Sequence, residues 1–122
     1  MCRLGASWAR QHILEAHKGA KVTVYAIWMP MLAGDARSEW DANVLDDPRV
    51  VNLWDAHRFA GLWFAEHGTG GLGDPSFPVW DAYFAFSGSA KWDAEPAPLI
   101  AAGSSIIDNV SGLERGFMPL LA

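Results

Sequence analysis

The sequence is poor in several features that would assign it to a well-marked class of protein. It contains one cysteine, Cys2, in 122 residues, so no disulfide can form within the chain and no oxidising compartment is required. No apolar run approaches the roughly 18 residues of a membrane span, and no charged-then-apolar leader with a cleavage site marks export. The net charge of -5 gives no electrostatic case for binding nucleic acid, which needs a basic patch, or an anionic membrane surface. We therefore predict a cytoplasmic protein whose partners are neither nucleic acids nor membranes.

The residues that are present indicate a folded domain. Hydrophobic residues make up 51% of the chain and seven residues are tryptophan, which excludes an intrinsically disordered chain. A chain of 122 residues is long enough to bury a core and falls within the range of one domain. We predict a single domain over residues 1–122.

The spacing of apolar residues and the turn residues between them predict alternating helices and strands. The predicted elements, in chain order, are a helix at 4–17, a strand at 22–29, a short helix capped by Asp35 that ends at Val44, a strand at 50–53, a helix at 56–67 capped by Asp55, a strand at 79–86, a turn at 87–90, a partner strand at 91–93, and a helix from about 106 to 115. The strand at 22–29 is apolar at nearly every position and is expected to be covered on both faces. The helix at 56–67 is apolar around most of its circumference and is expected to be well buried. The alternation favours an α/β domain with a mixed sheet.

Several short motifs can be considered as binding or catalytic sites, but none indicates a cofactor or a metal ion. The glycines of GTGGLG have the spacing of a dinucleotide-binding loop, but they follow a helix and run into Asp74, so we reject nucleotide binding. The histidines form no H-E-x-x-H motif and have no second cysteine beside them, so we expect surface or capping histidines and no metal site. No G-x-S-x-G elbow is present for a hydrolase nucleophile. We expect no cofactor.

Cys2 lies at the start of the first predicted helix. Unpaired N–H groups and the helix dipole at this end favour a thiolate, which is the setting of a reactive cysteine. The alternative is an inert cysteine, because a free thiol is commonly a small buried hydrophobe and a chain end is prone to fraying. Position and chemistry alone place the inert alternative first.

The order of four segments resembles the thioredoxin superfamily, especially its thiol-disulfide oxidoreductase and peroxiredoxin-like branches. CRLGASWARQHILEAH resembles the second half of the C-x-x-C redox motif and the helix after it, with Cys2 in place of the second cysteine. VTVYAIWMPML resembles the next core strand, and DPRVVNLWDAHRFAGLWFAE resembles a strand-to-helix insert common in these branches. FPVWDAYFAFSGSAKWD resembles the closing hairpin, with Pro78 where the family carries its cis-proline. The resemblance implies a thioredoxin-like α/β fold, a mixed sheet flanked by helices.

The chain departs from the family in lacking the N-terminal strand and the first cysteine of C-x-x-C. It is either a shortened version or a variant that fills the gap in its sheet in another way, such as with a partner chain. The resemblance then implies a redox lineage that is monothiol or inactive through Cys2, with protein or low-molecular-weight thiols as partners. Pro78 would shape the substrate-binding edge, with Trp28, Pro30 and Trp80 as neighbours. This requires Pro78 and the start of the first helix to meet across a shared crevice.

The alternative function is a non-catalytic protein-binding or assembly module on the same fold. Its basis is the tryptophan content, since tryptophan is enriched at binding hot spots, and the missing strand, which would leave unpaired sheet edges. Unpaired edges favour association with another chain, so a homo-oligomer is expected in this case. A small-molecule pocket lined by tryptophan is a third option with no sequence feature of its own.

Overall fold

The computed structural model describes residues 2–31, 42–72, 74, 76–92 and 96–121. The chain forms two compact units. The terminal unit comprises Met1–Val22 and Asp81–Ala122, and the central unit comprises Thr23–Trp80. The single domain over residues 1–122 stays a prediction.

The terminal unit begins with a helical segment that confirms the predicted first helix. α1 spans Cys2–Ala9 and continues through a π-helical turn at Arg10–Leu14 and a short 3₁₀ turn at Glu15–His17. A π-helical turn holds more residues than an α-helical turn and therefore rotates the buried face of the residues after it. In agreement with such a rotation, Leu14 at the end of the π-helical turn is buried and Ala16 in the following turn is exposed.

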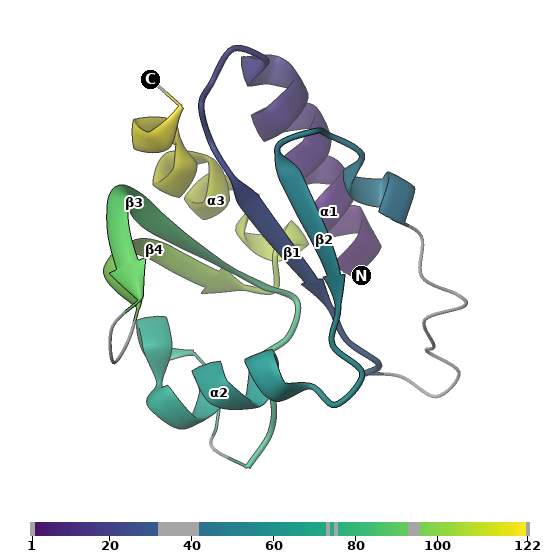
Figure 1. Cartoon of the computed structure of the whole chain (residues 1–122), viewed down its shortest axis with the longest axis vertical. Coiled ribbons are helices and arrows are strands. Elements are labelled where there is room, and N and C mark those ends of the chain that lie inside the picture. Colours follow the sequence, from purple (N-terminus) through teal and green to yellow (C-terminus); the bar gives the residue numbers. More distant parts are fainter. Residues whose placement is uncertain (1, 32–41, 73, 75, 93–95, 122) are drawn as a thin grey trace. The chain divides into compact units, whose positions relative to one another are not determined.

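A long antiparallel hairpin forms the sheet of the terminal unit (Figure 1). β3 spans Ala82–Trp92 and β4 spans Pro96–Ser104. The predicted turn at 87–90 is wrong, because these residues continue β3. They lie between the pairs Phe86↔Leu99 and Lys91↔Ala97, where β4 supplies a single residue. The small, polar sequence that predicts a turn therefore forms a bulge within the strand.

α3 packs on this hairpin and confirms the predicted last helix with a shift of a few residues. It spans Val110–Phe117 and contacts both strands of the hairpin. Leu113 is buried, and Gly116 lies so close to β4 that an added Cβ would be 2.6 Å from the Cβ of Ala101. The buried apolar side chains of this unit are those of Ala6, Ile13, Leu14, Ala85, Leu113 and Leu121.

The central unit contains a parallel pair of strands. β1 spans Val24–Trp28 and β2 spans Val50–Trp54, which confirms both predicted strands. They pair in register from Val24↔Val50 to Trp28↔Trp54. Among the described residues, β1 and β2 pair only with each other, and so do β3 and β4. The chain therefore has mixed helix and strand, as expected of an α/β protein, but its strands form two small sheets where one mixed sheet was expected.

α2 comes after β2 and spans Phe59–His67. The helix starts three residues later than predicted, and its N-cap residue is Arg58, whose side chain makes no capping hydrogen bond. Asp55 still stabilises this end, because its carboxylate oxygens accept hydrogen bonds from the backbone N–H groups of Phe59 (3.1 Å) and Ala60 (2.8 Å). The expectation of a well-buried helix is wrong for its large side chains, because only Gly61 and Ala65 are buried and Phe59 is 69% exposed.

The predicted helix from Asp35 to Val44 falls mostly outside the described residues. Its described end is a 3₁₀ turn at Ala42–Leu45. Within the described ranges, the structure contains no helix of the length and apolar character needed to cross a bilayer.

Candidate functional site

The residues expected to form a redox site are divided between the two units. Cys2 is the first residue of α1 in the terminal unit, as predicted, and its side chain lies outside the described part of the structure. The four expected substrate-binding residues all belong to the central unit, and they are Trp28, Pro30, Pro78 and Trp80. The crevice between Cys2 and Pro78 therefore stays a prediction.

Pro78 lies against α2. A Cβ on Gly61 would be 3.0 Å from the Cβ of Pro78, 3.0 Å from the sulfur of Met29 and 2.6 Å from the carbonyl oxygen of Val79. The backbone N–H of Val79 also donates a hydrogen bond of 2.9 Å to the carbonyl of Gly61. One glycine thus brings the chain at Pro78 close to Met29, the residue between Trp28 and Pro30. The grouping of Trp28, Pro30 and Trp80 around Pro78 as a substrate-binding edge stays a prediction.

The peptide bond before Pro78 differs from the one that the resemblance implies. The cis peptide bonds among the described residues are Ala97–Pro98 and Ser104–Ser105, so Phe77–Pro78 is trans. Pro78 itself is buried. Its ring packs against α2, and the peptide bond before it does not have the cis conformation of the proline in the thioredoxin superfamily.

Two successive hydrogen bonds fix the side chain of Trp28 on one face of the sheet. Its indole N–H donates to the side-chain oxygen of Asn52 (2.9 Å), and the Asn52 amide donates to the carbonyl of Leu45 (3.1 Å). These two hydrogen bonds connect β1, β2 and the 3₁₀ turn before β2. Because the only hydrogen-bond donor of the Trp28 ring is already used, Trp28 can offer a substrate its apolar faces but not its N–H.

The opposite face of this sheet carries four apolar side chains that are open to solvent. Residues at alternate positions share one face of a strand, and the exposed ones are Tyr25 (67% exposed), Ile27 (41%), Val51 (41%) and Leu53 (46%). They form two directly paired positions across the strands, Tyr25↔Val51 and Ile27↔Leu53. We call these four residues the apolar sheet face. The expectation that the first strand is covered on both faces is wrong for this side.

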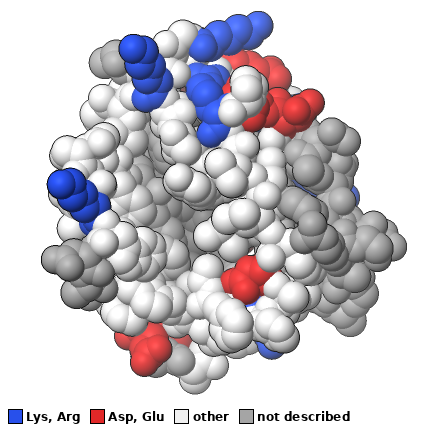
Figure 2. All heavy atoms as spheres, viewed as in Figure 1, with Lys and Arg blue, Asp and Glu red and all other residues white. Residues whose placement is uncertain are grey.

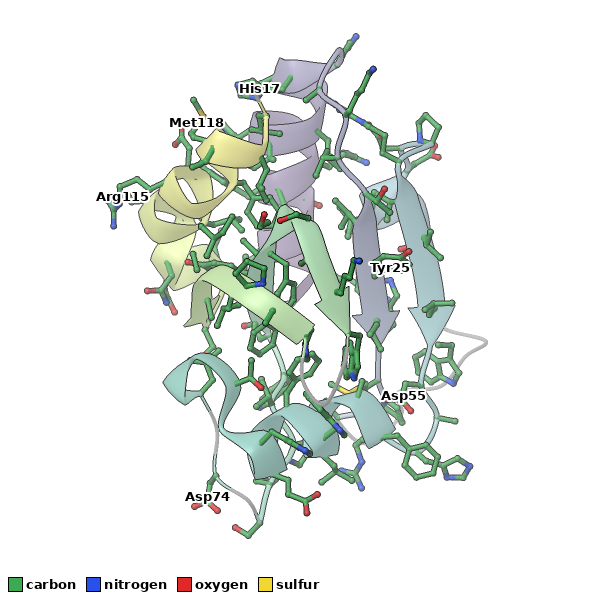
Figure 3. All side chains as sticks on the ribbon, turned by 60° about the vertical axis from the view of Figure 1, so that its left-hand side comes forward. His17, Tyr25, Asp55, Asp74, Arg115 and Met118 are labelled. Atoms are coloured by element: carbon green, nitrogen blue, oxygen red, sulfur yellow. The ribbon has the colours of Figure 1, made fainter. Side chains whose placement is uncertain are left out.

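Charged groups do not interrupt the apolar sheet face. The surface over β1 and β2 consists mostly of uncharged side chains (Figure 2), and Figure 3 marks Tyr25 on β1 and Asp55 at the end of β2. Just before β2, the guanidinium of Arg49 donates to both carboxylate oxygens of Asp47 at 2.9 Å. This side-chain pairing, with a further hydrogen bond from the Arg49 backbone N–H, lowers the pKa of Asp47 to about 2. The pair is therefore neutral as a whole at neutral pH.

The histidines have structural partners. His12 and His67 each stack on a tryptophan one helical turn earlier, Trp8 and Trp63, with ring centroids 4.6 and 3.9 Å apart. The Nδ1 atom of each ring also lies within 3.1 Å of that tryptophan's carbonyl oxygen. Both are exposed, in agreement with the prediction of surface or capping histidines. In the described part of the chain, no three His, Cys, Asp or Glu side chains are grouped to hold a metal ion.

Comparisons of the chain with protein-family models, with curated proteins and with solved structures gave no match. The resemblance to the thioredoxin superfamily thus rests on the order of short sequence segments. The function has to be inferred from the chain's own residues, and the apolar sheet face is the feature that its sequence did not predict.

Proposed function

We propose that this chain is a protein-binding or assembly module and that the apolar sheet face is its contact surface. The observation that carries the proposal is the exposure of four apolar side chains, from two strands, in directly paired positions. Single exposed apolar residues are normal on a protein surface, whereas a contiguous group commonly marks an interaction site. Covering such a group removes apolar area from water, at about 25 cal/mol for each Å².

The edges of the same sheet favour the same function. β1 and β2 are the only strands of their sheet in the described residues, so each has one edge without a strand partner. Exposed strand edges beside an apolar face invite pairing with another chain.

The partner we propose is a second copy of this chain. An apolar face needs no opposite charge to be complementary to itself, and most soluble homo-oligomers use one surface twice about a two-fold axis. The net charge of -5 opposes self-association only weakly, because salt screens exposed charges beyond about 8 Å at physiological ionic strength.

Light scattering as a function of concentration tests this proposal. The wild-type chain should show a mass above the 13.3 kDa of one chain, rising with concentration. Ile27→Asp and Leu53→Asp place charges in the apolar sheet face and should restore the mass of one chain. Phe59→Asp is the matched control, because Phe59 is more exposed than either residue but lies outside the sheet face. A wild-type chain that stays monomeric at all concentrations, or a control that dissociates like the two variants, would reject the proposal.

A second candidate function is monothiol redox chemistry at Cys2, in the thioredoxin lineage that the sequence resembles. The observation that favours it is the position of Cys2 as the first residue of α1, since the N-terminal end of a helix generally favours a thiolate. In the proposed step, the Cys2 thiolate attacks the disulfide of oxidised glutathione, forms a Cys2–glutathione disulfide and releases one glutathione thiolate. A cytoplasmic location, with its glutathione pool, is part of this proposal.

Thiol trapping tests the second candidate. At neutral pH, Cys2 in the folded chain should react with a disulfide reagent faster than a free model thiol does, and the excess should disappear in denaturant. Cys2→Ser supplies the background. A rate no faster than that of the free thiol would reject an activated Cys2.

A further inference from the structure

The terminal unit contains a pocket that none of the sequence motifs predicted. Its volume is about 370 Å³, which lies at the lower end of the usual range for small-molecule sites. It lies where α3 packs on the hairpin, and the residues that line it are Tyr83, Ile100, Ala101, Ala102, Gly112, Arg115 and Gly116. All of them belong to one compact unit.

Glycines leave room for the phenol group of Tyr83 in this region. A Cβ on Gly112 would be 3.0 Å from the Tyr83 hydroxyl oxygen, and a Cβ on Gly103 would be 2.9 Å from it. Within the described ranges, the structure shows no hydrogen bond to this hydroxyl group. A phenol is protonated at neutral pH, and burial raises the pKa of Tyr83 further, so the hydroxyl group has a hydrogen to donate.

Arg115 supplies positive charge at the rim of the same pocket. It is exposed, and Figure 3 shows its side chain extending outward from α3. Its positive charge lowers the Tyr83 pKa and so offsets part of the rise that burial causes. The structure shows no ion pair of Arg115 with any described carboxylate.

The other lining residues carry no polar side chain. Ile100, Ala101 and Ala102 come from β4, and Gly112 and Gly116 offer only backbone from α3. Such a wall suits a compact apolar group, while the two polar side chains suit an anionic one. An arginine guanidinium matches the geometry of a carboxylate, and a phenol hydroxyl donates one further hydrogen bond.

We infer that this pocket binds a small organic monocarboxylate. The carboxylate is held by the guanidinium of Arg115 and the hydroxyl of Tyr83, and the apolar body of the ligand lies against Ile100 and Ala101. This inference is independent of the apolar sheet face, which belongs to the other unit.

Titration of the full chain with benzoate, followed by NMR chemical shifts, tests the inference. Benzoate should bind with a dissociation constant of about 1 mM, as expected for a small ligand with one charged contact. Benzamide has nearly the same shape without the charge and should bind about tenfold more weakly. The shifts should be largest for residues of β4 and α3 that line the pocket.

Three variants locate the contact. Arg115→Gln should weaken benzoate binding about tenfold and Tyr83→Phe about threefold, since one loses a charged donor and the other a neutral one. Lys91→Gln is the matched control: it removes one positive charge from the same hairpin at a residue that does not line the pocket, and it should leave affinity unchanged. Arg115 is exposed and Tyr83→Phe retains the ring, so both variants should fold, which their NMR spectra will show.

Three results would overturn the inference. They are benzoate binding that does not saturate, equal affinities for benzoate and benzamide, and equal losses of affinity in Arg115→Gln and Lys91→Gln. None of these results bears on self-association, which light scattering reads separately.

Discussion

The described residues form two sheets of two strands each, yet one sheet is covered on a face by a helix of its own unit and the other presents an apolar face to solvent. α3 closes on the β3–β4 hairpin because Gly116 lets the helix backbone approach Ala101. In the central unit, α2 instead uses Gly61 to approach the segment at Val79, and the apolar sheet face stays exposed. A two-stranded sheet is only marginally stable without a further element packed on it. In each unit, a glycine on the helix permits the close approach that decides which surface the helix covers.

Gly61→Ala should have the largest effect on stability. Its Cβ would lie 2.6 Å from the backbone oxygen of Val79, so α2 and the segment must separate and strain their hydrogen bond. We expect the free energy of unfolding to fall by about 3 kcal/mol, measured by urea denaturation. Gly19→Ala is the control, since nothing lies within 4 Å of its added Cβ. An unchanged stability of Gly61→Ala would show that the approach of α2 is not this close.

Gly116→Ala applies the same test to the covered sheet. The added Cβ would be 2.6 Å from the Cβ of Ala101, and α3 must move away from β4 to relieve the contact. We expect a loss of about 2 kcal/mol in the free energy of unfolding. Gly88→Ala, on the same hairpin with nothing within 4 Å, should change it little. A larger loss in Gly88→Ala than in Gly116→Ala would contradict the packing of α3.

Asp55→Ala should weaken the start of α2. The two N–H groups of Phe59 and Ala60 would lose their acceptor, at a cost of about 1–2 kcal/mol, measured by thermal and urea unfolding. Asp55→Asn keeps one acceptor oxygen and should retain part of this energy. Asp46→Ala, at an exposed aspartate in the same unit, is the control. Equal stabilities of Asp55→Ala and Asp46→Ala would show that Asp55 does not stabilise the start of α2.

Acid should reduce the stability of the central unit through Asp47. The Arg49 side chain lowers the pKa of Asp47 from 3.8 to about 2, so the ionised carboxylate stabilises the folded state above the unfolded pKa. This contribution is lost as the pH falls from about 5 to about 2, and after solvent screening we expect it to be about 1 kcal/mol. Asp47→Asn should show a smaller loss than wild type over this range in urea denaturation. Parallel pH profiles of the two proteins would contradict the pairing.

Local signals predicted most of the secondary structure correctly. The strands at Val24–Trp28 and Val50–Trp54 are explained by β-branched and aromatic runs, and the hydrogen bonds of Asp55 at the start of α2 by its side-chain chemistry. The prediction of a turn at 87–90 failed because small polar residues are compatible with both a turn and a bulge. Only the pairing of β3 with the proline-containing β4 distinguishes the two, and that pairing joins residues that no local pattern connects.

The candidate surfaces were less predictable than the elements. β1 is apolar on both faces and β2 is interrupted only by Asn52, and such a pattern cannot say which face a neighbouring element will cover. The pocket at Tyr83 depends on Gly103 in a strand and Gly112 in a helix, whose closeness arises only when the two elements pack.

The sequence by itself determined the positions of β1, β2 and most of the helices, because propensity, apolar spacing and capping act over a few neighbouring residues, but it did not predict β4. Only the tertiary structure decided that the strands form two sheets, that Tyr25 and Leu53 share an exposed face, and that Arg115 and Tyr83 line one pocket. The physical reason is that burial depends on close approach between segments distant in sequence. A glycine such as Gly116 permits this approach, but the residues beside it in sequence do not show which segment it will contact.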